Sequence, residues 1–168
     1  MAKVARNATG FGLQTVWSTF TPLATKHNAV NLGQGFPDLP PADFVKQAAI
    51  DAISEDSVNQ YAPSRGRPGL VCELAREYEA DMGRPLTSDN VMVTLGANQG
   101  IFAALQTFVD QDETILLMEP YFDIYKPSVR IVGGKVVTSR LVFTGGDWSV
   151  DFQEAERVIR DNRVKVMI

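Results

Sequence analysis

Short apolar segments alternate with segments of helical periodicity in the second half of the chain, and this alternation restricts the possible folds. The segments that favour strands are 91–95, 114–118, 135–142 and 164–168. The segments between them have helical patterns, at 99–109, through Val132 and at 150–160. Helices of about ten residues return the chain to the same edge of a sheet, so consecutive strands pair in parallel. We therefore expect an α/β fold in which helices cover both faces of a mostly parallel sheet, giving three layers.

The first half of the chain is organised differently. Residues 1–40 show weak periodicity and end in the stretch NLGQGFPDLPP, which indicates an arm rather than part of a sheet. Two helices are expected after it, one at 42–53 and a second that ends at Gly83 and Pro85. The rest of this half is loop.

Composition excludes several classes of protein. The 45% hydrophobic and 21% charged residues are typical of a soluble globular protein. The net charge is −4 and no basic block is present, which argues against nucleic acid or an anionic membrane as the partner. The first residues lack the apolar run typical of a signal peptide, and no run of about 18 apolar residues occurs. With a single cysteine, Cys72, no internal disulfide can form, so we expect a cytoplasmic protein.

The last apolar segment, Val164 to Ile168, ends the chain at the edge of the sheet from which ligand-binding loops normally leave. A domain with a parallel sheet seldom stops at that edge. We therefore expect the sequence to be truncated.

The first candidate site is Gly96-Ala97-Asn98, between the strand expected at 91–95 and the following helix. A glycine there lets the backbone turn sharply and leaves the amide groups of the helix N-terminus exposed, which suits a phosphate. The alternative is an ordinary strand-to-helix turn in which Gly96 supplies only unusual torsion angles. The motif is neither a dinucleotide fingerprint nor a Walker A loop.

Three further candidates lie in loops. Phe122 is one of three aromatic residues just beyond a strand end, where they form either a wall for a planar ring or core packing. Tyr61 lies in a loop between two helices, where its hydroxyl either reaches a phosphate or packs. Gly35 allows a backbone to approach a ligand closely, or only a tight turn. His27, the only histidine, is expected on the surface, and Cys72 is expected to be a small core residue.

Four motifs occur in the order NLGQGFPD, NQYAPSRGRPGL, VTLGANQG and EPYFDIY. Together they resemble the class I aminotransferases of fold type I, which use pyridoxal 5'-phosphate, and among these the kynurenine/glutamine and methionine branch. The resemblance runs from about Gly12 to Ile168. It implies a division into an N-terminal arm with a small-domain segment, 1–41, and an incomplete cofactor-binding large domain, 42–168.

The resemblance also implies roles for individual residues. Gly96, Ala97 and Asn98 match the loop that holds the cofactor phosphate, although relatives often have threonine, tyrosine or glutamate in place of Asn98. Phe122 matches the aromatic residue that stacks on the pyridine ring. Tyr61 matches a tyrosine that reaches the phosphate bound by the other subunit, which implies a homodimer.

Two residues match the substrate site of the family. Gly35 matches a glycine beside the substrate carboxylate, and Trp17 matches an aromatic residue that lines the pocket for the amino-acid side chain. The implied substrates are an amino acid, with aromatic or sulfur-containing ones preferred, and a 2-oxo acid.

No catalytic residue can be assigned. The Schiff-base lysine of the family lies in a Ser-x-x-Lys context, and none of the six lysines has this context: they are Lys3, Lys26, Lys46, Lys126, Lys135 and Lys165. We therefore expect the 168 residues alone to be inactive. Two alternatives to transamination stay open, a cysteine-conjugate-type β-lyase of the same fold and a catalytically inactive remnant.

Overall fold

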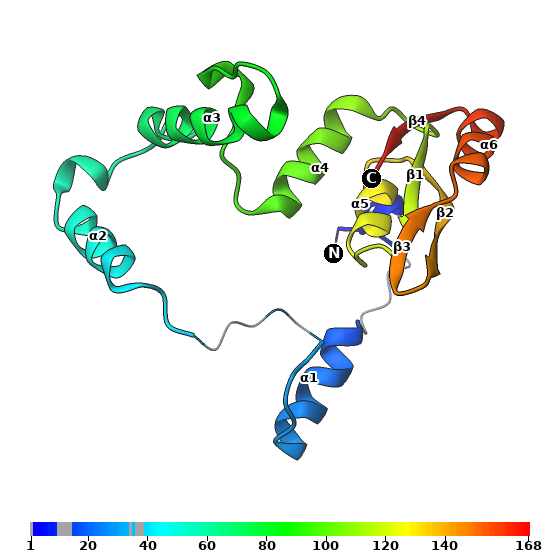
Figure 1. The fold of residues 1–168 in the computed structure, drawn as a ribbon, viewed down its shortest axis with the longest axis horizontal. Coiled ribbons are helices and arrows are strands. Elements are labelled where there is room, and N and C mark those ends of the chain that lie inside the picture. The colour runs from blue at the N-terminus through cyan, green and yellow to red at the C-terminus, as the bar shows by residue number, and fades with distance from the viewer. Residues whose placement is uncertain (1, 10–14, 34, 36–38) are drawn as a thin grey trace. The chain divides into compact units, whose positions relative to one another are not determined.

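The structure is a computed structural model that describes residues 2–9, 15–33, 35 and 39–168. The chain forms two compact units, and each is described by itself. The first unit comprises Met1–Phe11 and Thr94–Ile168, and the second comprises Gly12–Val93. Figure 1 shows the elements of both. The domain boundary implied at residue 42 stays a prediction.

The first unit is built on a four-stranded sheet. Its strands are β1 (Thr114–Glu119), β2 (Lys135–Thr144), β3 (Asp147–Val150) and β4 (Val164–Met167). Their order is β3-β2-β1-β4, in which β1 pairs in parallel with β2 and β4, and β3 pairs antiparallel with β2. The expected α/β fold with a mostly parallel sheet is confirmed.

Helices lie on both faces of this sheet. They are α4 (Ala97–Phe108), α5 (Tyr125–Ile131) and α6 (Phe152–Asn162). Figure 1 shows α6 on the opposite side of the sheet from α4 and α5. Successive side chains of a strand point to opposite faces of the sheet, so neighbouring β1 residues face different helices. The three expected layers are therefore present.

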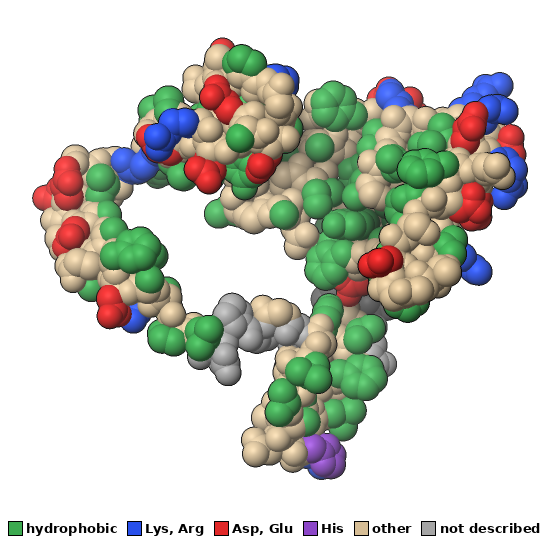
Figure 2. All heavy atoms as spheres, viewed as in Figure 1, with side chains coloured by type: hydrophobic (Ala, Val, Ile, Leu, Met, Phe, Trp, Pro, Cys, Tyr) green, Lys and Arg blue, Asp and Glu red, His purple; other side chains and the backbone are tan. Residues whose placement is uncertain are grey.

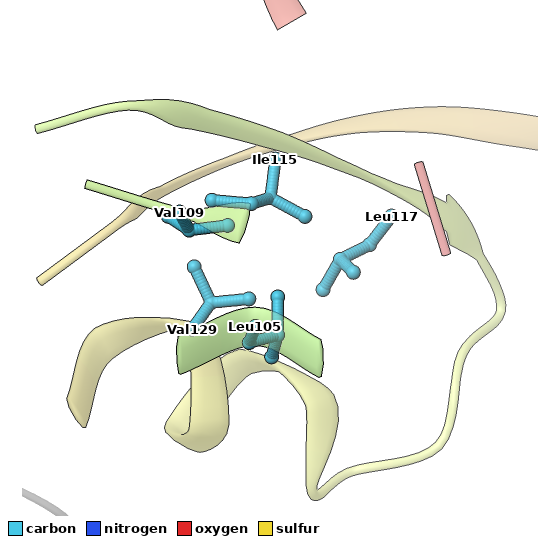
Figure 3. Close-up of a cluster of buried hydrophobic side chains, with 5 residues drawn as sticks. All are labelled: Leu105, Val109, Ile115, Leu117 and Val129. Carbon is cyan, nitrogen blue, oxygen red and sulfur yellow. The ribbon is translucent and has the colours of Figure 1, made fainter. Parts of the chain in front are cut away.

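The core of the first unit lies between β1 and the pair α4 and α5 (Figure 3). Ile115 and Leu117 of β1 are fully buried against Leu105 of α4 and Val129 of α5. Burying a side chain of this size contributes roughly 1.5–3 kcal/mol. The packing fixes α4 against β1.

The second unit is helical. It contains α1 (Val16–His27), α2 (Asp43–Ile53) and α3 (Pro68–Met82), with short 3-10 helices at Asp56–Val58 and Ser88–Asn90. Gly83 ends α3 in the left-handed region, as the sequence predicts. In the described part of the chain no helix is long and apolar enough to cross a membrane.

Two sequence-based expectations on the elements are wrong. Residues 91–95 form no strand, because no strand among the described residues pairs with them; the Val93 amide instead donates to the carbonyl of Arg65 at 2.9 Å. β3 was not expected, although Gly145-Gly146 between two apolar runs indicates a hairpin.

The sequence did not predict α1, which forms within residues 1–40, although no described residue of this stretch belongs to the sheet, as expected. Thr15 and Ser18 cap its start reciprocally, each side chain accepting from the other's backbone amide. Cys72 is also not a core residue, because it lies one position past the buried Val71 of α3 and is exposed. His27 is exposed at the end of α1, as expected (Figure 2, purple).

Candidate functional site

Gly96 starts α4 with a backbone conformation that a side chain would disfavour. Its φ is 79° and its ψ is 165°. A Cβ atom at this position would meet nothing within 4 Å, so the requirement for glycine comes from the torsion angles alone. The turn directs the chain from Thr94 straight into the first turn of the helix.

Two side chains that sequence reasoning missed fix this turn. The amide of Leu95 donates to Oε1 of Gln99 at 2.5 Å, and the Thr94 hydroxyl donates to the carbonyl of Gly96 at 3.0 Å. No side chain of the described residues caps the start of α4. The amide groups of its first turn, at Ala97 and Asn98, are therefore available to an anion, and the helix dipole favours negative charge there.

Phe122 lies just after β1 and differs from its aromatic neighbours. Tyr121 and Tyr125 pack against the buried core, whereas Phe122 is 47% exposed. The ring of Tyr125 meets that of Phe122 edge-on, with centroids 5.9 Å apart and planes at 76°. This contact orients the Phe122 ring and leaves part of it open to a planar ligand.

The start of α4 points toward the edge of the sheet at which β1 ends. The chain leaves α4, turns within a short connection and returns through β1, so the two elements run in opposite directions (Figure 1). Leu105 of α4 and Leu117 of β1 belong to the same buried cluster. The carboxyl ends of parallel strands are where ligands bind in such sheets. The turn at Gly96 therefore points toward the sheet edge beyond which Phe122 lies.

The other three predicted site residues belong to the second unit. Tyr61 is fully exposed, at 103%. Trp17 lies on α1 and lines an apolar groove of about 430 Å³ between the helix and the chain around Val30 and Leu32. Nothing lies within 4 Å of the position that a Cβ of Gly35 would take. Residues 34 and 36–38 of the same motif lie outside the described residues. The roles of these three residues stay predictions.

Comparison with known proteins decides the family. Residues 27–168 match the family "Aminotransferase class I and II". The chain belongs to the class I and II aminotransferases. The resemblance seen in the four sequence motifs is therefore confirmed.

Individual aminotransferases are similar over most of this chain. The kynurenine–oxoglutarate transaminase of Dictyostelium discoideum is 42% identical over 133 residues, which are 79% of this chain and 30% of the relative. The structure of N-succinyldiaminopimelate aminotransferase from Mycobacterium tuberculosis has a TM-score of 0.86 at 35% identity, covering 99% of this chain and 42% of that one. The methionine aminotransferase YbdL of Escherichia coli has a TM-score of 0.81 at 28% identity, covering 92% and 40%. This aminotransferase chain thus spans less than half the length of each.

Proposed function

We propose that this chain supplies the phosphate cradle, the ring-stacking residue and part of the substrate pocket of a pyridoxal-phosphate-dependent aminotransferase. The enzyme transfers the amino group of an aromatic or sulfur-containing amino acid to a 2-oxo acid. The observation that carries the proposal is the start of α4, where Gly96 presents uncapped amide groups toward the sheet edge beyond which the half-exposed Phe122 lies.

The residues present fit the cofactor. Its phosphate needs backbone donors in a positive field, which the first turn of α4 offers after the turn at Gly96. Its ring needs a flat apolar wall, which Phe122 offers, held edge-on by Tyr125. When bound, pyridoxal phosphate supplies an electron sink for the carbanion that forms as an amino acid loses its α-proton.

In this mechanism the residues of the chain bind and orient the cofactor and the substrate. The amide groups of Ala97 and Asn98 hold the phosphate, and Phe122 sets the plane of the ring. Tyr61 reaches the phosphate bound by a second subunit, so we propose a homodimer. The apolar groove beside Trp17 receives the side chain of the amino acid, which is consistent with a large apolar substrate.

No proton-transfer group is assigned within these 168 residues. None of the lysines follows the Ser-x-x-Lys pattern of the family. The 168 residues by themselves are therefore expected to form no covalent adduct with pyridoxal phosphate at one defined lysine that survives borohydride.

The proposed function is tested with the complete gene product that contains these residues. It is incubated with pyridoxal phosphate, an aromatic or sulfur-containing amino acid and a 2-oxo acid, and the products are separated. A new amino acid matching the 2-oxo acid supports transamination. Pyruvate with ammonia from a cysteine conjugate, without a new amino acid, would instead establish the lyase alternative. Failure to bind pyridoxal phosphate at all would refute both.

A further inference from the structure

The loop that carries Tyr61 is anchored on its N-terminal side by two side chains. The amide of Asn59 donates from Nδ2 to the carbonyls of Ile53 at 2.8 Å and Glu55 at 3.2 Å. The guanidinium of Arg67 reaches back across the loop and donates from Nη2 to the carbonyl of Val58 and, at 3.3 Å, to that of Gln60. Gln60 immediately precedes Tyr61.

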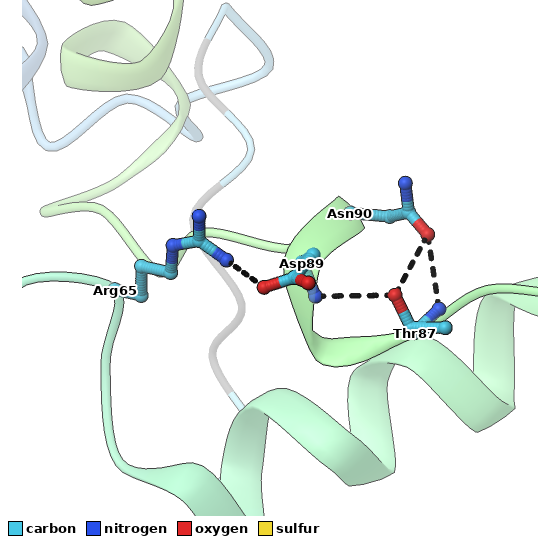
Figure 4. A network of polar contacts seen from close by, with 4 residues as sticks. All are labelled: Arg65, Thr87, Asp89 and Asn90. Carbon is cyan, nitrogen blue, oxygen red and sulfur yellow. Dashed lines mark hydrogen bonds and ion pairs between the residues drawn. The ribbon is translucent and has the colours of Figure 1, made fainter.

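The C-terminal side of the same loop is held by backbone contacts. The Gly66 amide donates to the carbonyl of Pro63 at 2.8 Å, closing a turn. Gly66 has a φ of 108°, and a Cβ on it would lie 2.7 Å from Cγ2 of Val93, so the chain packs directly on that valine. Arg65 pairs with Asp89 at 2.5 Å and ties the turn to the 3-10 helix Ser88–Asn90 (Figure 4).

Tyr61 stands between these two anchored sides with its own side chain fully exposed. None of the described residues bonds its hydroxyl. A bound conformation that exists before the ligand arrives costs less entropy to form on binding than one selected from a mobile loop. The contacts therefore hold the backbone on both sides of Tyr61 and leave its side chain exposed.

We propose that Arg67 is a positioning residue, which fixes the backbone on the near side of Tyr61 so that the phenol can bind the cofactor phosphate of a second subunit. The inference rests on the proposed function. Arg67 suits this task because a planar guanidinium holds several donors in fixed directions, whereas a lysine ammonium is a point charge on a flexible stem. It acts through the carbonyls of Val58 and Gln60 and touches no ligand.

Arg67→Met removes the donors and keeps an unbranched apolar stem, so it is the test variant in the complete gene product. Two quantities are measured, the backbone order parameters of residues 58–63 and the affinity for pyridoxal phosphate against that for pyridoxal, which lacks the phosphate. We expect lower order in the loop and an affinity for pyridoxal phosphate that is about threefold to tenfold weaker, the effect of losing roughly one hydrogen bond. The affinity for pyridoxal should not change.

The matched control is Arg76→Met, which removes the same charge from the exposed surface of α3, where Arg76 pairs with Glu73. It should change neither quantity. Arg67→Lys should restore part of the affinity, because an ammonium can still reach one carbonyl.

A double-mutant cycle separates positioning from a general structural effect. In a Tyr61→Phe background, Arg67→Met should no longer weaken the binding of pyridoxal phosphate, because the group it positions has gone. An equal loss in both backgrounds, or unchanged loop order in Arg67→Met, would overturn the inference. If the unmodified protein binds no pyridoxal phosphate, the proposed function fails and the inference with it. If the unmodified protein binds pyridoxal phosphate and Arg67→Met binds it equally well, the inference fails and the proposed function stands.

Discussion

Lys165 of β4 forms an ion pair of 2.8 Å with Glu113, the residue directly before β1. The hydrogen bond from Lys165 lowers the pKa of the Glu113 carboxyl, and the amide of Asp110, which donates to the same carboxylate, lowers it further. The same hydrogen bond raises the pKa of the Lys165 ammonium. The pair joins two parallel strands at the end of the sheet where both begin.

Because of this ion pair, we expect part of the stability of the fold to be lost in acid. A carboxyl whose folded pKa is lowered contributes stability above its unfolded pKa and loses it as the pH falls through the folded value. Melting temperature should therefore drop as the pH falls below the ordinary 4.5. Lys165→Met should make this drop smaller, and pH titration followed by circular dichroism measures it. An unchanged acid profile in Lys165→Met would show that other carboxyls dominate.

At Ser139 of β2 we expect a substitution that does not destabilise the fold. Its side chain is 1% exposed, and within the described residues its hydroxyl oxygen has no hydrogen-bond partner. A buried hydroxyl without a partner costs about 1–3 kcal/mol. Ser139→Ala removes it at little loss of volume, so the free energy of unfolding, measured by urea denaturation, should stay the same or rise by about 1 kcal/mol. A clear loss of stability would mean that the hydroxyl is bonded in solution.

Substitution of Gly96 should lower the stability of the fold and the affinity for pyridoxal phosphate together. Gly96→Ala forces a side chain into a conformation that costs about 1–3 kcal/mol, although there is space for the added methyl group. Relief of that strain would move the first turn of α4, so affinity for pyridoxal phosphate should also fall. Gly69→Ala is the control, because Gly69 has equal space and no positive φ. Equal behaviour of the two variants would contradict the role of Gly96.

Sequence periodicity predicted the three strands that pair in parallel. β1, β2, β4 and α6 lie within about two residues of the expected bounds, and α5 ends one residue before the expected Val132. The segment 91–95 has the composition of a strand, but a strand forms only where another strand completes its hydrogen bonds, and no described residues do so.

Some features of the candidate site could also be predicted from the sequence, and others could not. The turn at Gly96 could be predicted because a glycine between an apolar run and a helix is a local signal. The partial exposure of Phe122 could not, since it depends on which of three neighbouring aromatic rings the core of the first unit accepts. The contact of Arg67 with the Val58 carbonyl spans nine residues and depends on the path of the loop, which no local pattern encodes.

The last prediction concerns Phe122, and it separates ring stacking from core packing. Phe122→Ala in the complete gene product removes one wall of the cofactor site. Aromatic pairing contributes roughly 0.5–1.5 kcal/mol beyond the burial of area, so the affinity for pyridoxal phosphate should fall about two- to tenfold. Because the ring is 47% exposed, the apo-protein should lose much less than the roughly 3–5 kcal/mol that truncating a fully buried phenylalanine costs.

Phe122→Tyr is the matched control for this prediction, because it keeps the aromatic face and should cost little affinity. Cofactor binding is titrated by absorbance while the melting of the apo-protein is followed in parallel. The stacking role requires that affinity falls first and that the melting temperature changes little. An apo-protein that melts far lower, with unchanged affinity for pyridoxal phosphate, would instead place Phe122 in the core with Tyr121 and Tyr125, which already pack there.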